Sequence, residues 1–134
     1  PTSTVSLIIL NITFAGELDE KGDPRINKEF LNAIYQQAAR GPQKDLLVFS
    51  RKQNVSADLP AYAASVVIEG HETHTRTGFI HLPESLMQQV GMNQAGGLNI
   101  PVTHAKIFGW YANEYGSYVN SLGKLIDHIE KSLD

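Results

Sequence analysis

The segment TVSLIILNITF (4–14) constrains the fold most, because it is rich in β-branched residues and apolar at both odd and even positions. A strand with one face in water alternates apolar and polar residues, whereas this segment has apolar side chains on both faces. We therefore expect a strand covered on both sides, near the centre of a sheet. The chain has 134 residues, 42% of them hydrophobic, and can bury a core around such a strand.

Helices are predicted by apolar residues at three- and four-residue steps. The segment 24–40 has such a stripe, with Asp23 as a suitable N-cap before Pro24. A shorter helix is expected over 83–90. The clearest pattern is that of 115–133, and we expect its apolar stripe to pack on the sheet.

Further strands are expected at 44–50, 61–69, 74–82 and 100–110, with a hairpin turn near Gly70 joining the second and third of these. The predicted order is β-α-β-β-β-α-β-α. It indicates an α+β (or α/β) protein with one globular domain over residues 1–134, built on a mixed sheet of about five strands with two to three helices.

Composition limits the classes of partner. The net charge of −3 gives no basic excess for phosphates, so we expect no nucleic-acid partner. No apolar run is long enough to span a bilayer and no basic amphipathic segment is present, so we expect no membrane partner and a cytoplasmic location. The chain has no cysteine, which excludes disulfides and thiolate metal sites.

The stretch IEGHETHTRTGFIH (68–81) holds three of the five histidines. His71, Glu72 and His74 resemble the helical zinc motif H-E-x-x-H, but they are one residue short of it, and Gly70 disfavours a helix. These three residues are candidate metal ligands only if the chain turns between the histidines. The alternative is a polar hairpin with no metal, and we expect no cofactor other than, at most, a divalent metal ion.

His81 and His104 are candidate catalytic residues, because two histidines on paired strands can act as acid and base. The alternative for each is a histidine bonded to a neighbouring backbone group. Pro1 is a third catalytic candidate, because a free proline amine can act as a general base near neutral pH. No complete catalytic motif accompanies these residues.

The segment 107–118 holds five of the 11 aromatic residues. Aromatic side chains with polar tips suit both ligand pockets and protein interfaces. Trp110, Tyr111 and Tyr115 are therefore candidates for binding a ligand or partner, whereas Phe108 and Tyr118 are expected in the core.

Three functions follow from these patterns. The first is a non-enzymatic protein-binding or assembly module that self-associates or docks into a larger complex, and it leads because no catalytic set is complete. The second is a small metal-dependent or acid/base enzyme that uses His71, His74, His81 and His104. The third is a small-molecule carrier with a pocket near residues 92–111.

Overall fold

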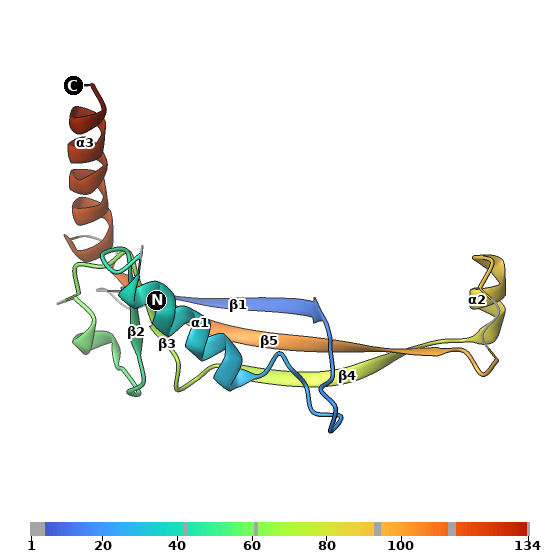
Figure 1. Ribbon diagram of the computed structural model, residues 1–134. Helices are drawn as coiled ribbons and strands as arrows, with labels where there is room; N and C mark the ends of the chain where they lie inside the picture. The colour runs from blue at the N-terminus through green and yellow to red at the C-terminus, as the bar shows by residue number, and fades with distance from the viewer. Residues whose placement is uncertain (1–4, 42, 61, 93–94, 113–114, 134) are drawn as a thin grey trace.

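The centre of the molecule is β5 (Leu98–Ala112), a 15-residue strand to which three other strands are hydrogen-bonded in the computed structural model (Figure 1). The structure describes residues 5–41, 43–60, 62–92, 95–112 and 115–133. The other elements are β1 (Val5–Ala15), α1 (Lys28–Arg40), β2 (Leu47–Ser50), the 3-10 turn η1 (Ser56–Asp58), β3 (Val66–Glu69), β4 (His74–Leu82), α2 (Glu84–Gln89), the π-helical turn η2 (Tyr115–Val119) and α3 (Asn120–Leu133). The predicted α+β class, the element order and the five-stranded mixed sheet are confirmed.

The sheet is organised around the two edges of β5. β1 pairs antiparallel with one edge, from the pair Val5–Ala112 to the pair Ala15–Val102. β3 and β4 pair antiparallel with the opposite edge, and β2 adds a parallel strand beyond β3. The strand order is therefore β1-β5-β3-β2, with β4 in line with β3 along β5.

The link between β3 and β4 interrupts one line of strand. From the pair Ile68–Gly109 to the pair His74–Lys106, the β3–β4 side advances by six residues while β5 advances by three. The extra residues loop out, as they do in a large β-bulge. The predicted hairpin near Gly70 is wrong, because β3 and β4 each pair with β5 and run in the same direction.

The expectation of a central, covered first strand is also wrong. β1 lies at the end of the strand order, and Leu7, Ile8, Ile9 and Leu10 are each 40–51% exposed. The apolar side chains at odd and at even positions are therefore exposed on the two faces of an edge strand. Nothing in the strand's own sequence distinguishes this arrangement from burial at the centre of a sheet.

The core lies where β2, β3 and α1 meet the adjoining parts of β1 and β5, and we call this region the body. One cluster joins Val5, Leu59, Val67 and Ala112, with Trp110 packed against it. A second cluster joins Leu47, Ile68 and Ile107, with Tyr35 and Ala39 of α1 packed against it. Val67 and Ile68 point to opposite faces of β3, so the sheet is covered on both sides here.

The start of α1 differs from the prediction. Asn27 is the N-cap, and its side-chain oxygen accepts a hydrogen bond of 2.9 Å from the backbone N–H of Phe30. Pro24 instead forms an isolated bridge with Leu18, which keeps the preceding segment in the loop. Asn and Asp are about equally good N-caps, so the tertiary bridge decides which of them is used.

Beyond the end of β1, the paired segments of β4 and β5 continue as a two-stranded ribbon that carries α2 at its far end (Figure 1). We call residues 79–92 and 95–101 the arm. α3 leaves the opposite end of β5 and projects away from the body (Figure 1). No helix in the described ranges is both long and apolar enough to cross a membrane.

Candidate functional site

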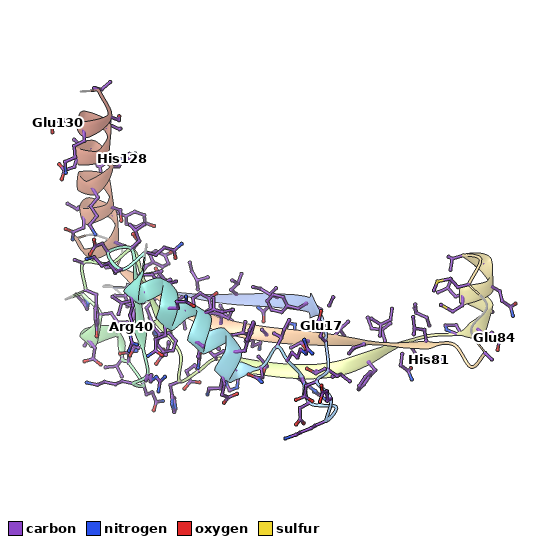
Figure 2. The ribbon with its side chains drawn as sticks, viewed as in Figure 1. Glu17, Arg40, His81, Glu84, His128 and Glu130 are labelled. Atoms are coloured by element: carbon purple, nitrogen blue, oxygen red, sulfur yellow. The ribbon has the colours of Figure 1, made fainter. Side chains whose placement is uncertain are left out.

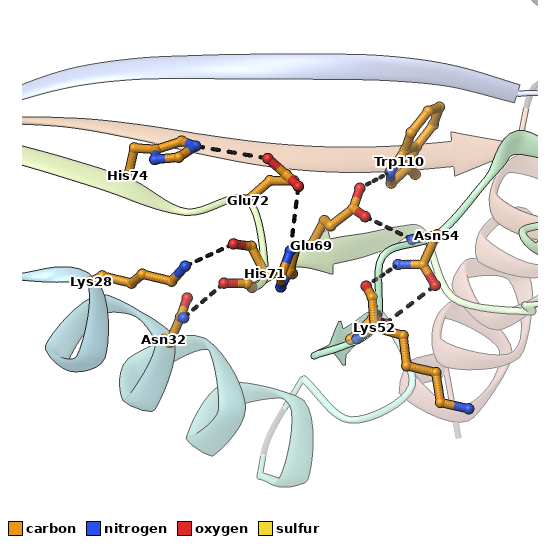
Figure 3. A network of polar contacts seen from close by, with 11 residues as sticks. Lys28, Asn32, Lys52, Asn54, Glu69, His71, Glu72, His74 and Trp110 are labelled. Atoms are coloured by element: carbon orange, nitrogen blue, oxygen red, sulfur yellow. Dashed lines mark hydrogen bonds and ion pairs between the residues drawn. The ribbon is translucent and has the colours of Figure 1, made fainter.

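The looped-out residues 70–73, which we call the histidine turn, bring His71, Glu72 and His74 together (Figure 3). Nε2 of His71 lies 3.8 Å from Oε1 of Glu72, and Nε2 of His74 lies 3.7 Å from Oε2. Each contact is an ion pair only when the ring is protonated. Within the described part of the chain, no three histidine or carboxylate side chains converge as a metal site requires. The turn therefore supplies two polar contacts to one carboxylate.

Helix α1 anchors this turn to the body. Nζ of Lys28 donates a hydrogen bond of 2.7 Å to the carbonyl of His71, and Nδ2 of Asn32 donates one of 2.9 Å to the carbonyl of Gly70 (Figure 3). These bonds satisfy backbone acceptors that the interruption of the strand removes from the sheet ladder. The arrangement explains the turn as a structural connection.

Glu69 is a buried acceptor whose contacts the sequence patterns did not predict. Its side chain is buried, Oε2 accepts a hydrogen bond of 2.5 Å from Nε1 of Trp110, and Oε1 accepts one of 2.8 Å from the backbone N–H of Asn54 (Figure 3). The available signal was a glutamate at the end of an apolar strand in a chain with a single tryptophan. Trp110, a candidate for binding a ligand or partner, is partly buried: its ring packs against the core and its N–H is used internally.

The two candidate catalytic histidines do not meet. Nδ1 of His81 lies 2.9 Å from Oδ1 of Asn99, whereas Nδ1 of His104 lies 3.3 Å from Oγ1 of Thr13. His81 pairs with Asn99 of β5, which lies five residues, or about 17 Å, along the strand from His104. Figure 2 shows His81 on the arm, away from the body. Strands β4 and β5 do pair, but their register keeps the two histidines apart. The third catalytic candidate, Pro1, lies outside the described residues.

The residues of the predicted pocket near 92–111 lie at opposite ends of β5. Residues 95–99 lie at the arm, whereas Tyr111 lies at the opposite end of the strand. A hollow of 420 Å³ is present at the foot of α3, where Tyr111, Ile8 and Ser65 are among its lining residues. The ring of Tyr111 meets that of Tyr118 edge to face at 6.1 Å. The side chain of Tyr115, the third aromatic candidate, lies outside the described residues.

The most unusual surface is on α3. Seven large side chains of η2 and α3, which we call the α3 stripe, are each 48–81% exposed: Tyr118, Val119, Leu122, Leu125, Ile126, Ile129 and Leu133. The polar side of the helix faces the body instead, because the hydroxyl of Ser121 bonds to that of Ser65 at 2.5 Å and Nζ of Lys124 donates to the carbonyl of Asp45 at 2.6 Å. Figure 2 shows His128 and Glu130 on the part of α3 far from the sheet. The expectations that this stripe packs on the sheet and that Tyr118 lies in the core are wrong.

Two more apolar surfaces are exposed. One is the edge strand β1, at Leu7–Leu10. The other is on the arm, where the exposed large side chains are Phe79, Ile80, Leu86, Val90 and Met92. Edge strands of soluble proteins are normally protected by charges, prolines or a covering element, because they can pair with further strands. The apolar run at Leu7–Leu10 lacks such charges.

The exposed area of the whole chain is correspondingly large. It amounts to 9357 Å² for a chain of 14.8 kDa. A compact monomer of this mass exposes about 7,000 Å². Large contiguous apolar patches on soluble proteins mark interaction sites. The three surfaces are therefore the best-supported candidate functional site.

No protein-family model matches the chain, and a search of curated proteins also finds no match.

Proposed function

We propose that this chain is a non-enzymatic assembly module that self-associates through its exposed apolar surfaces. The observation that carries the proposal is the α3 stripe, an apolar helix face turned away from the core that the described residues form. Docking of the same surfaces into a larger protein complex is the other form of this function.

The enzyme and carrier alternatives receive less support. His81 and His104 are separated along β5, and the residues of the histidine turn contact one glutamate without forming a larger ligand group. The hollow at the foot of α3 is large enough for a small molecule. However, Tyr118 of the α3 stripe also lines it, so a protein partner that covers the stripe would close it.

Native mass spectrometry with a chelator and sedimentation velocity over a concentration series would test the proposal. We expect a species with a multiple of 14.8 kDa whose mass does not change on chelation. A chain that stays monomeric at every concentration would contradict self-association. A metal-sized mass lost on chelation would instead favour the enzyme alternative at the histidine turn.

A further inference from the structure

The α3 stripe follows the spacing of a coiled-coil seam. In a heptad frame, Val119, Ile126 and Leu133 occupy a positions, and Leu122 and Ile129 occupy d positions. The steps between successive members are three, four, three and four residues, as knobs-into-holes packing requires. Val119 at a with Leu122 at d favours two-stranded pairing, whereas isoleucine at both a and d, as in the second heptad, is more common in three- and four-stranded bundles. The stripe is thus suited to another helix with the same repeat.

The attachment of α3 leaves this seam open. Ser121 and Lys124, which hold the helix to the body, are at the c and f positions of the frame, on the side away from the a and d residues. Because the helix is already formed and fixed at its first turns, a partner helix does not have to drive its nucleation. The seam runs the length of α3, about 21 Å.

The residues flanking the seam do not reject an identical helix. Gly123 and Glu130 occupy e positions, and Tyr118, Leu125 and Ser132 occupy g positions. Heteromeric coiled coils commonly exclude self-pairing with like charges at e and g. Here Glu130 is the single flanking charge, and in a parallel in-register pair it faces Leu125 of the other copy. The other charged residues of α3 lie on its outer face.

The exposed area fits a partner of this size. A standard interface buries about 800 Å² per partner. The seven large side chains of the α3 stripe, each 48–81% exposed, supply most of such an area. The surface in excess of a compact monomer is roughly 2,400 Å², which is enough to include this contact.

From the seam, its orientation, its uncharged flanks and this area, we infer that α3 packs along its a and d residues against α3 of a second copy of the chain. The inference rests on the assembly function proposed above and names its partner and contact.

Sedimentation equilibrium of the full chain tests the pairing. The wild type gives twice 14.8 kDa, whereas Ile129→Glu gives 14.8 kDa at the same concentrations. The dimer dissociation constant rises by at least about 100-fold, because the carboxylate is placed in an apolar seam. His128→Glu adds the same side chain one residue away, on the outer face, and stays dimeric. Circular dichroism shows that both variants are folded, since neither residue is part of the core.

A second surface separates failure of this inference from failure of the assembly function. Ile8→Glu places the same charge on the exposed edge strand β1. If the wild type is an oligomer that Ile129→Glu leaves intact while Ile8→Glu dissociates it, the α3 pairing is wrong and the assembly function stands. If the wild type is monomeric at all concentrations, the α3 pairing and self-association are both wrong.

Discussion

Helices α1 and α3 carry similar amphipathic patterns but meet different surroundings. In α1, Leu31 is buried and Tyr35 packs on the core, where burial raises the pKa of its hydroxyl, while Phe30 and Ile34 stay about half exposed. In α3, every residue of the stripe is exposed, and the polar side faces the body. The comparison teaches that an apolar stripe shows that a helix has a partner surface without showing where that surface is.

The two helices differ because of how the chain enters them. α1 follows a loop that is fixed by the bridge between Leu18 and Pro24, and it is hydrogen-bonded through Lys28 and Asn32 to the histidine turn. α3 follows β5 after only a short π-helical turn, at the end of the sheet (Figure 1). A helix that leaves the end of a strand in this direction has no sheet surface beneath its stripe.

The test with the largest expected effect compares Leu31→Ala in α1 with Leu125→Ala in α3. Leu31 is 6% exposed, so its truncation leaves a cavity and lowers the free energy of unfolding by about 2–4 kcal/mol. Leu125 is 53% exposed, and we expect a change within about 0.5 kcal/mol. Urea unfolding in the Ile129→Glu background measures both without a contribution from association. Equal losses would mean that α3 packs on the body.

A second test removes the central polar contact of the body. Glu69→Gln replaces one carboxylate oxygen with an amide N–H group, so Trp110 or Asn54 loses its acceptor. We expect a loss of about 2 kcal/mol in the free energy of unfolding, because hydrogen bonds to charged groups are stronger than neutral ones. Urea unfolding followed by Trp110 fluorescence measures it. Unchanged stability and an unchanged emission maximum would show that Glu69 is not the acceptor.

A third test adds a methyl group in the histidine turn. In Gly70→Ala, the new Cβ would lie 2.2 Å from Cζ of Phe49, so the ring must move. We expect a loss of about 1–3 kcal/mol from overpacking. Thermal unfolding measures the change, and Gly78→Ala is a control, since nothing lies within 4 Å of its added Cβ. A neutral Gly70→Ala would indicate that Phe49 repacks freely.

The smallest expected effect is at Gly123 in α3. Gly123→Ala has no neighbour within 4 Å and should stabilise the helix by about 0.5–1 kcal/mol through backbone entropy. The change should slow amide hydrogen exchange in α3 by about two- to fivefold and leave exchange in β3 unaltered. A slowing of both elements would show that α3 and the body unfold as one unit.

The order of the elements could be predicted from the sequence, because it depends on local periodicity and turn residues. Strand pairing could not. In segments 61–69 and 74–82, apolar and polar residues alternate as in the two strands of a hairpin, yet both segments pair with β5. The run at Leu7–Leu10 has the composition of a central strand and lies at an edge, because composition does not report how many neighbours a strand has.

The candidate sites depended on contacts between segments distant in sequence. Proximity along the chain grouped His71, Glu72 and His74 correctly. Whether His81 meets His104 depends on the register of β4 against β5, and this register places His81 opposite Asn99, five residues from His104. The burial of Glu69 and the partial burial of Trp110 likewise depend on the pairing of β3 with β5, which no local pattern contains.

Strand β5 has a mechanical consequence for any assembly. Its 15 residues extend about 50 Å, with α2 near one end and α3 at the other. Eleven residues of β1 pair with residues 102–112 of β5, and they stiffen that part of the strand, which ends nearest α3. A partner bound at the arm would therefore be held at a set distance from a partner bound at α3, and the length of β5 would determine that spacing.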